Sequence, residues 1–224
     1  LGAKAPEMAH FSLLTGAKGE GLSKRLGSAS IKSYREEDGL EAMSIVSLLT
    51  RLGSSDPIEP FTDIQPLIDG FEFSKYGRGA AKFDPRDLEL LNAKILHVTD
   101  FDAVKDRLPE GVTEAIWNVA RANIEKLDDT VEWLTIVNGP VSPVIEDADF
   151  IAKAAALLPS GEWDATTWKA WTTAVKEETG TKGKQLFMPL RQAVTGLNHG
   201  PEMGTLLPLI GAERVKARLA GQKA

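Results

Sequence analysis

Cysteine is absent from this 224-residue chain, and histidine occurs only three times. Without cysteine the chain can form neither a disulfide nor a thiolate metal site. His10, His97 and His199 are too widely separated in sequence to form a recognisable metal-binding motif. The lack of thiols agrees with a reducing compartment, and we expect a cytoplasmic protein. We therefore expect no metal site in the chain.

Long apolar runs are also missing. No stretch of about 18 apolar residues is present, so we expect no transmembrane helix and no membrane partner. The first residues do not combine a basic segment with an apolar one, as a secretory signal would. The sequence begins at Leu1 rather than methionine, and we expect it to be a processed protein or a piece of a longer one. Its length allows one large domain or two to three small ones.

Acidic residues outnumber basic ones overall, but basic residues are in excess near the end of the sequence. The net charge is −6, whereas residues 180–224 carry seven lysines and arginines against two acidic residues, a net charge of +5. The first 179 residues therefore carry −11. A basic end on an acidic chain indicates a polyanionic partner, and solubility explains the same charges equally well.

A basic loop near the start is the first candidate site. Gly21-Leu22-Ser23-Lys24-Arg25 follows two further glycines and precedes a run of small residues. Glycine lets a backbone approach its ligand closely, and Ser23, Lys24 and Arg25 offer a hydroxyl and two cations to a phosphate. Surface loops often carry such pairs, and the motif alone favours a solvated loop.

The hydrophobic pattern predicts a mainly α protein. Apolar residues recur at helical spacing in most of the chain, and no β-alternation is evident beyond residue 60. Residues 1–20 are irregular or strand-like. Asp84-Pro85 is a typical helix start, with a capping side chain followed by proline. The predicted helices include 40–52, 112–127 and 148–158, one that ends near Gly180, one that ends at Gly196, and a final pair around Gly211.

Aromatic and cationic side chains mark the second half of the sequence. Trp163, Trp168 and Trp171 could stack on bases or form a partner surface, but their number favours the core of a small helical domain. Arg191 falls at the edge of an apolar stripe, so its guanidinium is expected to point outward. That stripe comprises Leu186, Phe187, Leu190 and Val194.

Several ordered motifs resemble bacterial glutamyl-tRNA synthetases, which are class I aminoacyl-tRNA synthetases. Ala9-His10-Phe11 and the Ser23-Lys24-Arg25 loop resemble the end of the catalytic domain, and residues 83–92 resemble a middle segment. Residues 182–196, with the motif Met188-Pro189-Leu190-Arg191, resemble the anticodon-binding end, and residues 199–211 extend it. The motifs occur in the order found in the family, so the resemblance spans essentially the whole chain.

The resemblance implies a C-terminal fragment built from four segments. Residues 1–30 would be the remnant of the catalytic domain, with short irregular or β structure, and residues 31–97 a helical stem-contact region. Residues 98–159 and 160–224 would be two α-helical anticodon-binding subdomains. The parent enzyme would join glutamate to tRNA(Glu) in protein biosynthesis, using ATP and Mg²⁺. The nucleotide-binding fold is absent, so we expect no catalytic residue, no bound cofactor and no aminoacylation by the fragment alone.

The resemblance also assigns roles to single residues. Ser23, Lys24 and Arg25 match the signature loop that steadies the ATP phosphates, with Lys24 as the main charge on the developing pyrophosphate. The family commonly has lysine where this chain has Gly21, which removes one positive charge from the loop. Arg191 matches an arginine that contacts anticodon bases. The tRNA-binding residues expected near this region are Lys184, Gly200 and Met203.

A separate position bears on tRNA choice. Some family members use an arginine in the first anticodon-binding subdomain to exclude tRNA(Gln), and Asn123 matches it here, with Arg121 two residues earlier. The apolar pattern predicts Asn123 to be a buried amide, whereas Arg121 can reach RNA. Loss of the arginine implies relaxed choice, so both tRNA(Glu) and tRNA(Gln) remain candidate partners of a monomeric protein. The alternative is an α-helical protein-interaction module that binds no RNA.

Overall fold

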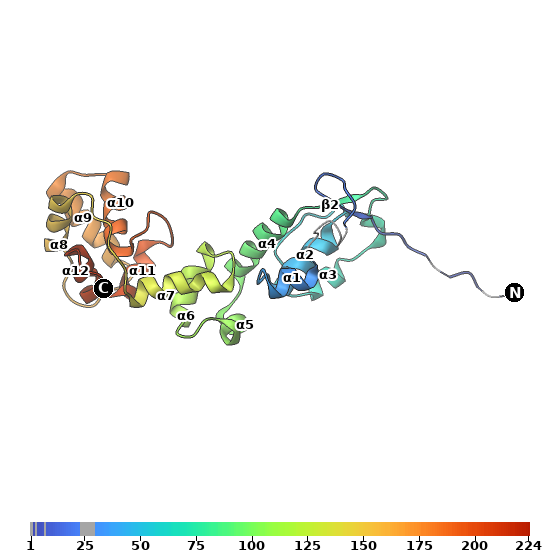
Figure 1. Cartoon of the computed structure of the whole chain (residues 1–224), viewed down its shortest axis with the longest axis horizontal. Helices are drawn as coiled ribbons and strands as arrows, with labels where there is room; N and C mark the ends of the chain where they lie inside the picture. The colour runs from blue at the N-terminus through green and yellow to red at the C-terminus, as the bar shows by residue number, and fades with distance from the viewer. Residues whose placement is uncertain (1, 3, 7, 23–29) are drawn as a thin grey trace. The chain divides into compact units, whose positions relative to one another are not determined.

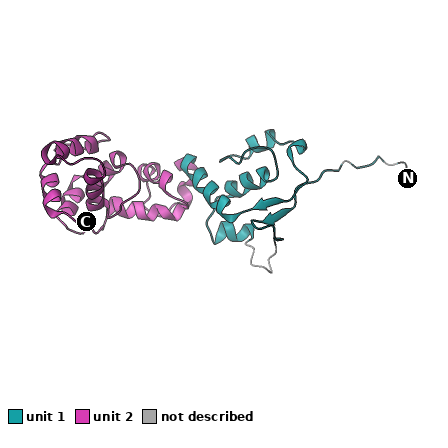
Figure 2. Ribbon diagram, turned by 90° about the horizontal axis from the view of Figure 1, so that it is seen from above, with its two compact units in different colours: residues 1–99 teal, residues 100–224 magenta. Residues whose placement is uncertain are grey.

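The computed structural model describes residues 2, 4–6, 8–22 and 30–224, and it is 55% helical. The prediction of a mainly α protein is therefore confirmed. The chain divides into two compact units, residues 1–99 and residues 100–224 (Figure 2). Within the described ranges, no helix combines the length and the apolar character needed to cross a membrane. The finer division into four segments stays a prediction.

Unit 1 combines short helices with one small sheet (Figure 1). Strands β1 and β2 pair in parallel, with Leu14 opposite Ala81 and Gly16 opposite Phe83. The elements are β1 (Leu14–Gly16), α1 (Ile31–Glu36), α2 (Ala42–Arg51), α3 (Gln65–Asp69), the 3₁₀ turn η2 (Phe73–Lys75), β2 (Ala81–Phe83) and α4 (Pro85–Val98). The strand β2 corrects the expectation of no β structure beyond residue 60. It was missed because it is only three residues long and its partner strand lies 67 residues earlier, so the local sequence shows no strand pattern.

Helices α2 and α4 pack against each other and form the core of unit 1. The helix expected over 40–52 is observed as α2, and α4 begins as predicted at Asp84, whose carboxylate accepts the backbone N–H of Arg86 at 2.9 Å. The buried Asn92 side chain of α4 accepts the backbone N–H of Glu41, just before α2, at 2.7 Å. The apolar core comprises Leu40, Ile45, Leu48, Phe83, Leu88, Leu91 and Ile95.

Unit 2 is helical throughout its described secondary structure. Its elements are α5 (Phe101–Val104), η3 (Lys105–Arg107), α6 (Glu114–Ala120), η4 (Arg121–Asn123), η5 (Leu127–Asp129), α7 (Thr130–Asn138), α8 (Ala148–Ala156), α9 (Thr167–Thr179), α10 (Lys184–Thr195), α11 (Met203–Ile210) and α12 (Ala212–Leu219). Elements α5 and α6 lie at one end of the unit and α8, α9 and α10 at the other (Figure 1).

The predicted helix over 112–127 is wrong in its second half. Helix α6 ends at Ala120 and is followed by the turn η4. The Asp129 carboxylate accepts the backbone N–H groups of Glu125 and Lys126, each at 2.8 Å. A side chain that binds the backbone in this way competes with the helical hydrogen bonds and turns the chain.

The core of the second half of unit 2 is built around a buried tryptophan. Trp171 on α9 is fully buried, and its indole N–H donates to the Ala154 carbonyl of α8 at 2.8 Å. Trp163 and Trp168 are half-buried. The core interpretation is confirmed for Trp171, which leaves the three tryptophans no common partner surface.

Candidate nucleic-acid interface

Helix α10 begins at a position that only glycine occupies easily. Gly183 has φ of 58° and ψ of −138°, and its carbonyl accepts the N–H groups of Leu186 and Phe187. Lys182, just before Gly183, and Lys184, the first residue of the helix, are both exposed. The N-terminus of a helix is electropositive, and the two lysines add to its attraction for anions.

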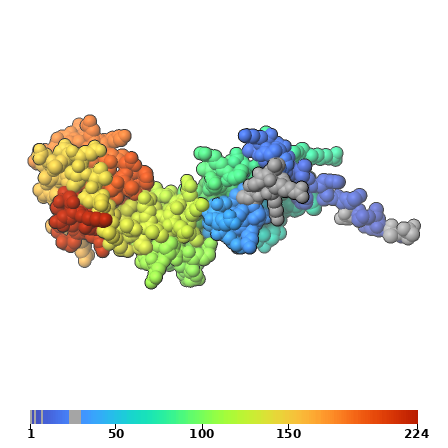
Figure 3. Space-filling view, in the orientation of Figure 1, coloured from blue at the N-terminus to red at the C-terminus, as the bar shows by residue number. Residues whose placement is uncertain are grey.

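Three side chains form a stripe on α10, which we call the α10 face: Lys184, Phe187 and Arg191. Positions three and seven residues after Lys184 lie on the same side of a helix, so the stripe runs along about 10 Å. Lys184 is exposed and the Phe187 side chain is 45% exposed. Figure 3 shows α10 in orange on the surface of unit 2. The α10 face therefore offers a cation, an aromatic ring and a guanidinium to a ligand.

Phe187 is the residue that the sequence pattern placed wrongly. It was expected in the apolar stripe of this helix, whereas Leu186, Leu190 and Val194 are buried and Phe187 is not. Its ring packs beside Trp168 of α9, with centroids 6.3 Å apart. This contact holds one side of the ring and leaves nearly half of the side chain accessible. The spacing to Lys184 and Arg191 is the signal that could have identified it.

Arg191 joins α10 to the loop that precedes α11. One terminal nitrogen, Nη1, donates to the His199 carbonyl at 3.2 Å, and Nη2 donates to the Pro201 carbonyl at 2.7 Å. Partial burial lowers the pKa of Arg191 from its ordinary value. These two bonds fix residues 199–201 against α10. Because a guanidinium has five N–H donors, Arg191 keeps its positive charge and further donors at the base of this loop.

Gly200 lies between those two carbonyls in tight contact with an indole. Its φ is +117°, and a Cβ at this position would lie 2.4 Å from Cη2 of Trp133 on α7. Met203 is the first residue of α11 and is buried. The structure thus brings Arg191, Gly200 and Met203 together around residues 196–203, with Gly200 and Met203 facing protein.

Arg121 and Asn123 lie elsewhere in unit 2, in the turn after α6. Nη1 of Arg121 is 3.7 Å from the Asp100 carboxylate. Asn123 is exposed, which corrects the expectation of a buried amide. The break in the helix after Ala120 takes Asn123 off the apolar face and turns it to the surface.

The predicted phosphate loop cannot be placed, because Ser23, Lys24 and Arg25 lie outside the described residues. The segment before it is described: Gly21 forms an antiparallel bridge with Thr15 of β1. Among the described residues, no group of three or more metal-ligating side chains comes together.

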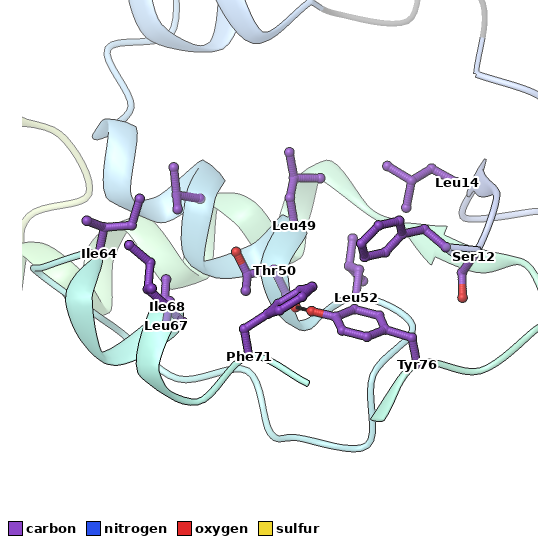
Figure 4. Close-up of a pocket in the computed structure, with 12 residues that line it drawn as sticks. Ser12, Leu14, Leu49, Thr50, Leu52, Ile64, Leu67, Ile68, Phe71 and Tyr76 are labelled. Atoms are coloured by element: carbon purple, nitrogen blue, oxygen red, sulfur yellow. Dashed lines mark hydrogen bonds between the residues drawn. The ribbon is translucent and has the colours of Figure 1, made fainter. Parts of the chain in front are cut away.

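Unit 1 also contains an apolar pocket of about 650 Å³ (Figure 4). Figure 4 marks one hydrogen bond between the lining residues: the Tyr76 hydroxyl donates to the Thr50 carbonyl at 2.5 Å. The other lining groups are mainly hydrocarbon and include Phe11, Leu49, Ile68 and Phe71. The polar side chains of its lining are the hydroxyl groups of Ser12, Thr50 and Tyr76, and the lining includes no Asp, Glu, His, Lys or Arg.

Comparison with known proteins identifies a domain within unit 2. A family model described as an anticodon binding domain matches residues 145–222, which include α8 to α12. The α10 face and the loop that Arg191 holds both lie in this matched region. Unit 2 therefore carries an anticodon-binding domain.

The whole chain is similar to glutamate–tRNA ligase 1 of Maricaulis maris, at 49% identity over 227 residues, and to glutamate–tRNA ligase 2 of Methylorubrum populi, at 47% over 229 residues. Each alignment covers 100% of this chain and 51% of the relative. The chain thus spans about half the length of the curated relatives it matches. It is homologous along its whole length to the C-terminal half of the glutamate–tRNA ligases, as its motifs indicated.

Solved structures share this fold. A glutamate tRNA ligase from Elizabethkingia meningosepticum, crystallised in complex with its amino acid, superposes with a TM-score of 0.74. The match covers 98% of this chain and 51% of that one, at 21% sequence identity. At this identity the likeness shows the fold alone.

Proposed function

We propose that the chain is the tRNA-binding portion of a glutamate–tRNA ligase, which joins glutamate to tRNA with ATP and Mg²⁺. The observation that carries the proposal is the α10 face within the anticodon-binding domain. RNA recognition at an anticodon uses unstacked bases, which stack on aromatic rings and hydrogen-bond to side chains while cations neutralise phosphates. Lys184, Phe187 and Arg191 supply those three functions on one helix.

Each residue of the α10 face has a separate role. Lys184 contacts a phosphate, where its charge displaces counterions from the RNA. The exposed side of Phe187 stacks on a base while Trp168 holds the ring from behind. Arg191 positions residues 199–201 through two carbonyls and presents its remaining donors to a base edge. Gly200 and Met203 act by shaping this loop.

The ATP chemistry belongs to the whole ligase. Ser23, Lys24 and Arg25 would steady the ATP phosphates beside a nucleotide-binding fold in the other half of such a protein. The chain alone therefore does not aminoacylate tRNA. We place the protein in the cytoplasm and propose that it acts as a monomer, since one anticodon-binding domain serves one tRNA.

The choice of tRNA rests on Asn123 and Arg121. Exposed Asn123 offers an amide where a tRNA(Glu)-specific ligase would use an arginine, and the neighbouring Arg121 is held near Asp100. An amide can donate to or accept from different bases, whereas a guanidinium only donates. We therefore propose that the protein accepts tRNA(Gln) as well as tRNA(Glu).

Binding of transcribed tRNA to the chain tests this function. The dissociation constant for tRNA(Glu), followed by fluorescence anisotropy, should rise steeply between 50 and 200 mM salt, by about tenfold or more. Unlabelled tRNA(Gln) should compete within about tenfold of tRNA(Glu). Strict rejection of tRNA(Gln) would contradict the proposed acceptance of tRNA(Gln) and would leave the proposed tRNA(Glu) binding intact. No salt-dependent binding of either tRNA contradicts the whole proposal and favours a protein-interaction module.

A further inference from the structure

The loop between α10 and α11 is held by polar contacts with α10. The Thr195 hydroxyl accepts a backbone N–H of the loop at 3.1 Å. Arg191 donates to the two carbonyls on either side of Gly200. The side chains of Asn198 and His199 are exposed. The backbone of the loop is therefore restrained, while an amide and an imidazole remain accessible to a ligand.

An aromatic side chain from a different helix also packs against this loop. Trp133 on α7 is buried, and a Cβ at Gly200 would lie 2.4 Å from its Cη2, 2.8 Å from its Cζ3 and 3.5 Å from its Cζ2. These three atoms form the outer edge of the six-membered ring of the indole. Trp133 lies outside residues 145–222, the region that the anticodon-binding domain model matches. The loop backbone thus rests on a residue from outside the matched domain.

The indole N–H of Trp133 does not explain why tryptophan occupies this position. Within the described part of the chain, its Nε1 is buried and has no hydrogen-bond partner. A buried donor without an acceptor lowers stability, and phenylalanine would fill the site with a ring that lacks this donor. A phenylalanine ring, however, reaches less far from the main chain. The property that only tryptophan supplies here is the reach of its second ring to Gly200.

We propose that Trp133 is a positioning residue for anticodon recognition, whose ring edge fixes Gly200 and, through it, the loop that Arg191 holds. The inference rests on the proposed RNA-binding function and extends it to helix α7. A loop that is already ordered binds RNA at a smaller entropic cost than one that must be ordered on binding. Without the ring edge the loop keeps its bonds to α10 but gains space beside α7. RNA would then have to order it, and affinity would fall.

The same substitution at two buried tryptophans tests the proposal. Trp133→Phe removes the ring edge beside Gly200, whereas Trp117→Phe makes the same loss of volume in the neighbouring helix α6. At a temperature where both variants are folded by circular dichroism, we expect Trp133→Phe to weaken tRNA(Glu) binding by about five- to tenfold. The slope of log affinity against log salt should not change, because no phosphate contact is lost. Trp117→Phe should bind like the unsubstituted chain.

A double-mutant cycle shows whether the ring edge and Gly200 act together. In the unsubstituted chain Gly200→Ala drives a Cβ into Trp133, whereas in Trp133→Phe the edge is gone and only the strain of the positive φ remains. We expect Gly200→Ala to lower the melting temperature by about 3 °C less in the Trp133→Phe background. Gly200→Ala alone should also weaken tRNA(Glu) binding, because it displaces the loop from the ring.

Amide hydrogen exchange gives a readout that needs no RNA. In Trp133→Phe the backbone N–H groups of residues 197–200 should exchange faster, while those in the middle of α10 keep their rates. Unchanged exchange in the loop, or equal weakening of tRNA(Glu) binding by Trp117→Phe, would overturn the proposal.

The two proposals fail in different ways. If the unsubstituted chain binds tRNA(Glu) and Trp133→Phe binds it equally well, the role of Trp133 is contradicted and the proposed function stands. If the unsubstituted chain binds no tRNA, the proposed function is contradicted, and the role of Trp133 in recognition with it.

Discussion

At the scale of single residues, Gly200 is the most constrained position in the candidate interface. Its positive φ and its contact with Trp133 exclude a side chain for two separate reasons. We expect Gly200→Ala to lower the free energy of unfolding by about 2–4 kcal/mol, because a Cβ adds overpacking to backbone strain. Urea unfolding of the variant measures this loss.

Gly161 separates the two causes. Its φ is +95°, and a Cβ there would meet no atom within 4 Å. Gly161→Ala should therefore show the cost of backbone strain alone, about 1–2 kcal/mol. Equal losses for the two variants would show that the Trp133 contact yields freely and that Gly200 does not shape the loop.

The positions of single residues were predicted unevenly from the sequence. Arg191 was placed correctly at the edge of its helical stripe, because a helix period decides which side chains share a face. Phe187 and Asn123 were misplaced, since their exposure depends on contacts made elsewhere. Trp168 holds the Phe187 ring at the surface, and the early end of α6 turns Asn123 outward.

At the scale of elements, the junction of α2 and α4 depends on one amide. Asn92 accepts the Glu41 N–H inside the core of unit 1. Asn92→Ala would remove the side-chain acceptor of that part-buried N–H, at a cost of about 2 kcal/mol in unfolding free energy. Chemical unfolding followed by far-ultraviolet circular dichroism checks the value. As a control, Lys94→Ala on the exposed side of α4 should change it by less than about 0.5 kcal/mol, and similar losses for both would contradict the role of Asn92.

Helix ends marked by local chemistry were predicted well. Asp84 with Pro85 begins α4, and Gly180 and Gly196 end their helices in the left-handed conformation. The end of α6 and the strand β2 were not predicted. The Asp129 carboxylate that turns the chain lies nine residues beyond Ala120, and β2 depends on a distant partner strand.

At the scale of the whole molecule, the two units carry different fluorophores. All five tryptophans lie in unit 2 and both tyrosines in unit 1. If the units unfold separately, as two compact bodies are expected to do, Asn92→Ala should leave the tryptophan transition within about 1 °C of the unsubstituted chain. Circular dichroism should meanwhile show an earlier loss of structure. A tryptophan transition that moves by the full amount would show that the units unfold together.

The charge pattern overlaps the anticodon-binding domain only in part. The +5 net charge of residues 180–224 coincides with most of the anticodon-binding domain, which begins at residue 145. Two of those seven cations, Arg191 and Arg218, donate to backbone carbonyl groups; Arg191 is partly buried and Arg218 fully buried. A count of charges therefore overstates the cationic surface, because burial of a side chain depends on tertiary packing.

The salt dependence of tRNA(Glu) binding by α10-face variants tests the central claim most directly. Lys184→Ala should reduce the slope of log affinity against log salt by about 1, since one phosphate contact is lost. Phe187→Ala should weaken binding by about 1–3 kcal/mol without changing the slope, since stacking releases no counterions. Lys153→Ala, an exposed lysine on α8, is the charge-matched control and should change neither quantity. If Lys184→Ala and Phe187→Ala bind tRNA(Glu) like the control, the α10 face is not the RNA-binding surface.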